Sequence, residues 1–128
     1  MNKEDKELLL KDLAARLPYG VSVYIRYKTG EPCYGKLTPK DIQWFIDSKI
    51  ETIKPYLRSL SSMTKKERKE YTSLCNRQDI DTPTWSKIIW HDTYKSIDWL
   101  NKKMFDYRGL IEKGLAIAVT EENNPYKE

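Results

Sequence analysis

The chain has 128 residues, of which 39% are hydrophobic, 33% charged and 12% aromatic, and its formal net charge is +4. This is the size of one domain that folds without disulfide or metal cross-links, and its four Trp and nine Tyr residues argue against disorder. No apolar run is long enough to cross a membrane. Because neither the mixed charges at the start nor the two cysteines indicate export, we expect a cytoplasmic protein without a membrane partner.

The positive charge is unevenly distributed along the chain. Its excess lies within residues 20 to 80, whereas the segment from residue 81 onward is slightly acidic. A basic surface is compatible with a polyanionic partner, but an excess this small produces little field at physiological salt. Charge alone therefore does not predict a nucleic-acid-binding protein.

A helix is expected at the start of the chain, from about Lys3 to Leu17. Asn2 is a suitable N-cap, Leu9 and Leu13 recur at helical spacing, and Pro18 ends the pattern. One face of this helix must therefore pack against the rest of the protein.

A small antiparallel sheet is expected next, because the hydrophobic period changes to two after Gly20. Lys28, Thr29 and Gly30 indicate the turn of a hairpin. High β propensity favours a third strand, and Pro55 is expected to end a short fourth one. The expected strands cover residues 21–28, 32–38, 42–46 and 50–53. With the first helix they predict an α+β fold, with a curved sheet of three or four strands or an SH3-like partial barrel.

Helices are expected in the C-terminal half. Thr64 and Glu67 form a capping box for a surface helix that reaches about Cys75. Thr93 caps a second helix, in which Ile97, Leu100 and Met104 form an apolar stripe widened by Trp99 and Phe105.

The end of the chain is expected to dock and then become flexible. Gly114 is suited to a left-handed residue after a helical turn. Residues 115–119 are apolar enough for a buried strand or docked segment, and residues 120–128 are polar. We therefore expect one domain over residues 1–119 and a flexible tail over 120–128.

Four stretches carry a resemblance: LKDLAARLPYG at residues 10–20, IKPYLRSLSSMT at 53–64, FDYRGLIEKGLA at 105–116 and, in addition, SIDWLN at 96–101. Through them the chain resembles a group of small proteins of gut bacteria, their phages and other mobile elements. Residues 31–49 and 77–90 fit less well. The resemblance implies a bacterial or phage protein of the cytoplasm, and because the group has no assigned activity it transfers no site residues.

No set of residues indicates catalysis, a cofactor or a metal. His91 precedes a helix cap and has no orienting partner in the pattern, so we expect a loop or cap histidine. Cys33 and Cys75 lack the paired spacing of zinc ligands, and Cys33 is expected to be a small buried side chain. Asp79 and Asp81 fit a solvated loop, and no glycine motif for nucleotide binding occurs. We therefore expect a non-enzymatic protein without cofactors.

The outer face of the predicted hairpin is the candidate binding surface. It comprises Tyr24, Arg26, Lys28, Tyr34 and Lys36. Aromatic rings can stack on bases while cations meet phosphates, but tyrosine is also a common strand residue and helices could cover this face. A register slip of one residue would exchange the two faces.

Trp85 and Trp90 lie beside a predicted loop, and we expect one of them to be partly exposed. Large aromatic side chains are enriched at protein interfaces. With no catalytic set in the sequence, these aromatics favour a protein–protein interaction module. The alternative is a nucleic-acid-binding small barrel that uses the hairpin face, and an enzyme of unrecognised type is the third hypothesis.

Overall fold

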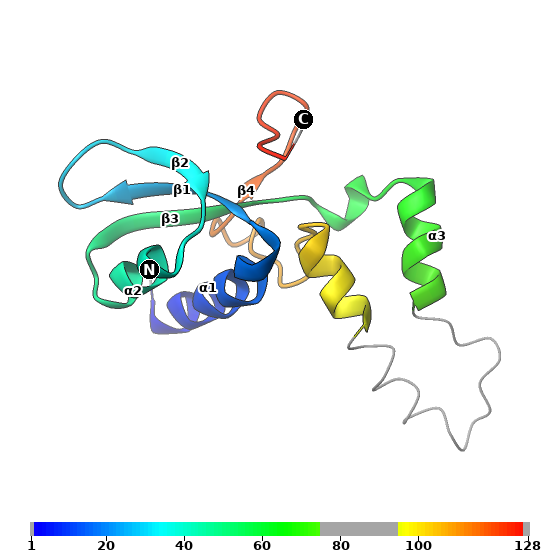
Figure 1. The fold of residues 1–128 in the computed structure, drawn as a ribbon, viewed down its shortest axis with the longest axis horizontal. Coiled ribbons are helices and arrows are strands. Elements are labelled where there is room, and N and C mark those ends of the chain that lie inside the picture. Colours follow the sequence, from blue (N-terminus) through cyan, green and yellow to red (C-terminus); the bar gives the residue numbers. More distant parts are fainter. Residues whose placement is uncertain (1, 75–94, 127–128) are drawn as a thin grey trace, which may run out of the picture.

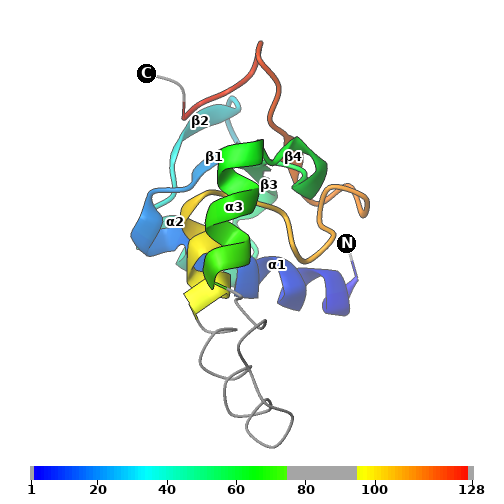
Figure 2. The same cartoon turned by 90° about the vertical axis from the view of Figure 1, so that its right-hand side faces the viewer.

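The computed structural model describes residues 2–74 and 95–126, which form an α+β fold around an open, mixed four-stranded sheet of order β2-β1-β3-β4 (Figure 1). Helices α1 and α2 lie on the same side of the sheet in both views (Figures 1 and 2). Within the described ranges, no helix has the length and apolar character needed to cross a bilayer. The elements are α1 (Lys3–Arg16), a 3-10 turn η1 (Leu17–Tyr19), β1 (Ser22–Tyr27), β2 (Cys33–Lys36), α2 (Pro39–Ile46), β3 (Ile50–Leu57), a 3-10 turn η2 (Leu60–Ser62), α3 (Lys65–Leu74) and β4 (Ile117–Ala118).

The first helix begins and packs as the sequence predicts. The side chain of Asn2 accepts a hydrogen bond of 2.7 Å from the backbone N–H of Asp5, which caps the helix. Leu9 and Leu13 are fully buried against the sheet. The helix ends at Arg16, where the 3-10 turn η1 leads the chain into β1.

The predicted hairpin is formed by β1 and β2, with Tyr24 directly opposite Tyr34. Val23 and Ile25 of β1 point into the core. The expectation that Cys33 is buried is wrong, because β2 is shorter than predicted and all four of its residues are exposed. Among the strands of the described ranges, β2 lies at the edge of the sheet and pairs with β1 alone.

Residues 42–46 are helical, so the third predicted strand is wrong. Thr38 Oγ1 accepts a hydrogen bond of 3.3 Å from the Asp41 N–H, and Asp41 Oδ2 accepts one of 3.0 Å from the Thr38 N–H. Pro39 occupies the first turn of the helix, where its missing N–H costs nothing. This local capping box overrides the β propensity of the residues that follow and allows Phe45 to be buried.

The predicted end of the next strand near Pro55 is also wrong, because β3 continues through the proline to Leu57. β4 pairs with β3 at Tyr56 and Leu57, so within residues 2–74 and 95–126 no strand lies on that side of Pro55 to require its N–H. β4 runs parallel to β3, which makes the sheet mixed rather than wholly antiparallel. The sheet is open, and the SH3-like arrangement remains an expectation from the sequence.

Residues 95–126 form the C-terminal segment, which begins with a helix and joins the sheet as β4. A helix covers residues 95–102, and Met104, two residues after its end, has a left-handed φ of 63°. Of the predicted apolar stripe, Leu100 and Met104 are buried and Ile97 is 37% exposed, and Ser96 occupies the buried position one turn before Leu100. The predicted left-handed Gly114 is confirmed, with a φ of 75°. The expected caps and ends at Thr93 and Cys75 lie outside the described residues.

Helix α3 begins with the predicted capping box and lies on the surface without a buried residue. Glu67 Oε1 accepts from the Thr64 N–H at 3.0 Å, and the Glu67 carboxylate also receives two hydrogen bonds of 2.7 Å from Arg58. The Arg58 guanidinium rests on the Phe105 ring, 4.2 Å from its centroid. Arg58 therefore joins the start of α3 to the core.

We expect Glu67→Gln to lower the free energy of unfolding by about 2 kcal/mol at neutral pH, because it removes charge-assisted hydrogen bonds. The hydrogen bonds from Arg58 lower the pKa of Glu67 from 4.5 to about 2. A carboxylate with a lowered folded-state pKa stabilises the fold above its unfolded pKa and loses that effect as pH falls. Urea unfolding should therefore show the difference between wild type and variant shrinking from pH 4.5 towards 2. Glu112→Gln, at an exposed position, is the control and should change little at any pH.

Candidate binding surface

Three tyrosines lie side by side across β1, β2 and β3, on the sheet face opposite the helices. We call Tyr24, Tyr34 and Tyr56 the tyrosine face. The ring centroids of Tyr24 and Tyr34 are 5.3 Å apart, and those of Tyr34 and Tyr56 are 6.5 Å apart. Tyr34 is 70% exposed, whereas Tyr56 is buried beneath it and the C-terminal segment. The face is a continuous aromatic surface with one prominent ring.

Basic side chains flank the tyrosine face. In the strand register Lys36 lies opposite Ser22 and Lys54 lies opposite Tyr24, so both belong to this face. Neither lysine forms an ion pair with any residue of the described ranges. Arg26 lies 3.6 Å from Glu51, but both side chains are more than half exposed and such a pair contributes little. Two lysine charges therefore remain available at this surface.

The structure brings together four of the five surface residues predicted from the sequence. Tyr24, Arg26, Tyr34 and Lys36 share the face, whereas Lys28 lines a separate hollow beyond the end of β1. Sequence reasoning missed Lys54 and Tyr56, because Pro55 was expected to end the strand. The sequence itself carried a signal that could have placed them, because apolar Ile53, Pro55 and Leu57 alternate with Lys54 and Tyr56.

A shallow hollow of about 480 Å³ lies between the tyrosine face and the C-terminal segment. Tyr34, Lys36 and Tyr56 line it from the sheet, and residues 122–125 line it from the other side. Burial raises the pKa of Tyr56 above its ordinary value, and the neighbouring Tyr34 and Tyr24 add to this effect. The Tyr56 hydroxyl is therefore neutral at physiological pH. The hollow can accept one side chain of a partner beside a cationic rim.

The C-terminal segment is held against the sheet by Tyr126. Its hydroxyl donates to the backbone oxygen of Tyr56 at 2.7 Å and accepts from the backbone N–H of Ser22 at 3.0 Å. The Tyr126 phenol thus bridges the Ser22 N–H and the Tyr56 oxygen at the point where β1 and β3 separate, in place of a direct backbone hydrogen bond between the two strands. The segment that the sequence predicts to be a flexible tail consequently forms one wall of the hollow.

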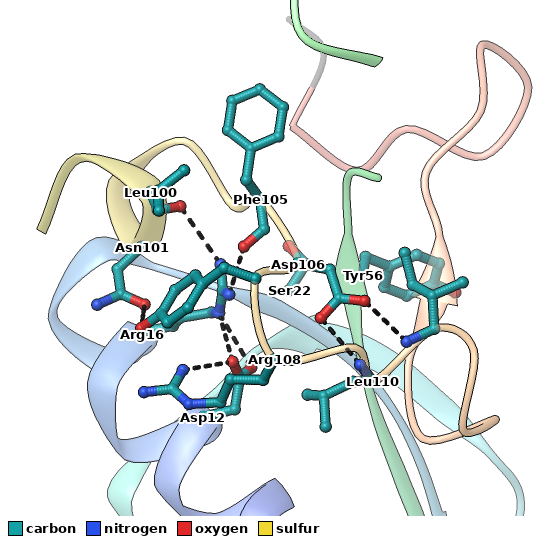
Figure 3. Close-up of polar contacts among 12 residues, drawn as sticks. Asp12, Arg16, Ser22, Tyr56, Leu100, Asn101, Phe105, Asp106, Arg108 and Leu110 are labelled. Atoms are coloured by element: carbon teal, nitrogen blue, oxygen red, sulfur yellow. Dashed lines mark hydrogen bonds and ion pairs between the residues drawn. The ribbon is translucent and has the colours of Figure 1, made fainter. Parts of the chain in front are cut away.

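A buried ionic cluster connects α1 to the C-terminal segment (Figure 3). Asp12 and Arg16 are both fully buried and form an ion pair of 2.9 Å, and Arg108 reaches Asp12 at 2.8 Å. Arg16 also donates to the backbone oxygens of Leu100 and Phe105. Sequence reasoning missed this cluster, although the spacing of Asp12 and Arg16 places them on the same helix face as the buried leucines.

The ionic cluster is bonded to several parts of the fold. Nearby, the Asp106 carboxylate accepts from the N–H groups of Leu110 and Ile111 at 2.9 Å each and so holds the last turn (Figure 3). Across the part of the chain that the structure describes, every buried side-chain nitrogen or oxygen has a hydrogen-bond partner. The fully buried groups of the cluster, Asp12 and Arg16, are therefore satisfied by partners within the fold.

Among residues 2–74 and 95–126, no three His, Cys, Asp or Glu side chains are grouped so that they could hold a metal ion. Trp85, Trp90, His91 and Cys75 lie outside the described residues, as do Asp79 and Asp81. Comparison of the chain with protein-family models, curated proteins and solved structures gives no match.

Proposed function

We propose that the chain binds another protein by adding an extended, acidic segment of that partner to the free edge of β2. The observation that carries this proposal is an exposed edge strand beside a hollow and two lysines, Lys36 and Lys54, that form no ion pair within the described part of the chain. Strand addition obtains affinity from main-chain hydrogen bonds and specificity from pockets for alternate side chains. The edge of β2 offers the main-chain groups and the hollow offers a side-chain pocket, and both lie within a few residues of Tyr34.

The strand register indicates which backbone groups are free. Pro55 has no N–H, so its opposite residue Val23 directs its own N–H and C=O away from β3 and towards Gly35 of β2. The 2.9 Å hydrogen bond from the Leu37 N–H to the Val21 oxygen continues this alternation. The backbone groups of Tyr34 and Lys36 therefore point outward, where a partner strand would pair.

The charge and shape of the surface favour an acidic partner segment. Lys36 and Lys54 would meet its carboxylates, and the prominent ring of Tyr34 would cover its backbone. An apolar or aromatic side chain of the partner fits the hollow beside Tyr56. Aromatic anchors of this kind supply most of the affinity at protein interfaces.

Selection from a library of extended peptides tests the proposal. We expect enrichment of acidic sequences, with affinities that fall about tenfold in Lys36→Pro. Proline removes the outward N–H and leaves the ladder to β1 intact, since an edge strand tolerates it there. Lys36→Ala is the matched control, because it removes the charge but keeps the N–H. Equal binding by the Pro and Ala variants, or no enrichment of acidic sequences, would contradict the proposal.

Nucleic acid is the alternative occupant, since tyrosine rings and lysines on a sheet can bind single strands. Glu51 beside Arg26 and Glu122 at the hollow both reduce the positive potential of the face. The two occupants differ in their response to salt. Binding of single-stranded oligonucleotides that weakens steeply with salt and is lost in Tyr34→Ala would favour nucleic acid over protein.

A further inference from the structure

A second hollow lies at the opposite end of β1 from the first and shares no lining residue with it. Its volume is about 530 Å³, which is within the range of small-molecule sites. It lies where β1 and α2 both end. At this point a bulge between Arg26 and Tyr27 shifts the register of β1 against β3. Its lining residues are Tyr27, Lys28, Thr29, Trp44, Ser48 and Lys49. We call it the tryptophan hollow.

Two aromatic rings form the wall of the tryptophan hollow. Tyr27 and Trp44 meet edge to face, with ring centroids 5.7 Å apart and an interplanar angle of 76°. Both rings also pack against the hydrophobic core, so their positions are fixed from behind. Rings held in this way offer a preformed surface for a flat aromatic ligand.

Four lysines surround these rings. Lys28 and Lys49 line the hollow, Lys40 Nζ lies 4.4 Å from the Trp44 ring centroid, and Lys6 Nζ lies 3.5 Å from Ser48 Oγ. No residue of the described ranges forms an ion pair with any of them.

Two acidic groups lie near the hollow. The Asp41 carboxylate accepts a hydrogen bond from the Thr38 N–H and also contributes to the raised pKa of Tyr27, and Asp47 accepts from Gln43 at 3.1 Å. The end of α2 adds only about half a negative charge, so the local balance favours an anion.

Backbone hydrogen bonds at the C-terminal end of α2 fix the positions of Ser48 and Lys49, which line the tryptophan hollow. Ser48 has a left-handed φ of 60°, the Lys49 N–H donates to the Trp44 oxygen at 2.8 Å, and the Ser48 N–H donates to the Phe45 oxygen at 3.1 Å. This pair of bonds closes the helix and directs Ser48 and Lys49 to the same rim as Lys28. The Lys28 N–H lies 3.5 Å from the Lys49 oxygen and ties the two sides together.

We propose that the tryptophan hollow binds a nucleotide, with the base against the rings of Tyr27 and Trp44 and the phosphate between Lys28 and Lys49. Aromatic rings provide a stacking surface for any base, and ammonium groups pair with phosphate oxygens. The hydroxyls of Thr29 and Ser48 can donate to the same phosphate. The ligand is either a free mononucleotide or one nucleotide of a single strand, since the recognised chemistry is the same.

Titration of the full chain with AMP, adenosine, inorganic phosphate and a single-stranded octanucleotide tests this proposal. The readout is the NMR signal of the Trp44 indole N–H, assigned with Trp44→Phe. We expect saturable shifts with AMP or the octanucleotide, and at least about tenfold weaker binding of adenosine and of phosphate alone. Binding of AMP identifies a free nucleotide, whereas binding of the octanucleotide alone identifies a strand.

The double variant Lys28→Glu/Lys49→Glu should weaken the nucleotide at least about tenfold. Lys65→Glu/Lys69→Glu on the exposed face of α3 makes the same change in net charge and should leave the affinity within about twofold. No shift of the Trp44 signal at millimolar nucleotide, or equal weakening in both double variants, would overturn the proposal. Because Tyr34 and Lys36 do not line this hollow, the result is independent of peptide binding at β2.

Discussion

Replacement of Arg16 by methionine is expected to lower the free energy of unfolding by about 3 to 5 kcal/mol, because it breaks a buried ion pair and leaves Asp12 charged. The backbone oxygens of Leu100 and Phe105 also lose their donor. The free energy of unfolding of domains of this size is only about 5 to 15 kcal/mol, so the expected loss is a large fraction of the total stability. Urea unfolding followed by circular dichroism measures the change from the shift in midpoint at constant slope.

Two further variants isolate the role of the ionic cluster. Arg26→Met removes an arginine from an exposed pair and should change the stability by no more than about 0.5 kcal/mol. The double variant Asp12→Leu/Arg16→Met should be less destabilised than the sum of its single variants, because it removes both charges of the fully buried pair together and leaves only the partly exposed Arg108 without its carboxylate. If Arg16→Met were as mild as Arg26→Met, the cluster would not hold α1 to the C-terminal segment.

Replacement of Tyr126 by phenylalanine is expected to cost about 1 to 3 kcal/mol, because the Ser22 N–H and the Tyr56 oxygen both lose the phenol that joins them. Phenylalanine keeps the ring and its packing, so the loss reports the hydroxyl. Thermal and urea unfolding of the two proteins measure it. Tyr19→Phe, at an exposed ring, is the control and should have little effect.

The contribution of Tyr126 should also depend on alkaline pH. Burial raises the pKa of Tyr126 from 10.0 to about 12. A group whose folded-state pKa is raised stabilises the fold fully below its unfolded pKa, and that effect is lost as pH rises towards the folded value. The stability advantage of wild type over Tyr126→Phe should therefore be constant below pH 10 and decrease between pH 10 and 12. A constant difference across this range would show that the hydroxyl is not buried as described.

Elements with strong local signals were predictable from the sequence. Asn2 and the leucine spacing placed α1, Thr64 and Glu67 placed the start of α3, and Gly114 placed the left-handed residue before β4. In each case the determining hydrogen bond or backbone conformation lies within a few residues of the signal. Interactions between residues close together in the sequence therefore determine where these elements form.

The errors arose where a local preference competed with another effect. Residues 42–46 have high β propensity, but the capping box of Thr38 and Asp41 begins a helix just before them. Pro55 was expected to end a strand, yet it is tolerated because β4 begins pairing one residue later. Pro55 is therefore tolerated because of the place where β4 docks, and β4 lies about sixty residues further along the chain. The sequence around Pro55 does not reveal that docking position.

The same long-range dependence limited the prediction of the binding surface. Tyr24, Arg26, Tyr34 and Lys36 followed from strand alternation alone. Tyr56 and Lys54 join them only because β3 continues past Pro55, and the hollow exists only because Tyr126 anchors residues 122–125. The open edge of β2 likewise becomes visible once the order of the strands is known.

Amide hydrogen exchange at residue resolution tests the proposed strand addition most directly. Exchange is measured for the chain alone and with a saturating acidic peptide from the library selection. The register predicts that the outward N–H groups of Tyr34 and Lys36 become protected, whereas Gly35, already directed at Val23, changes little. Bound peptide without new protection at Tyr34 and Lys36 would contradict the account.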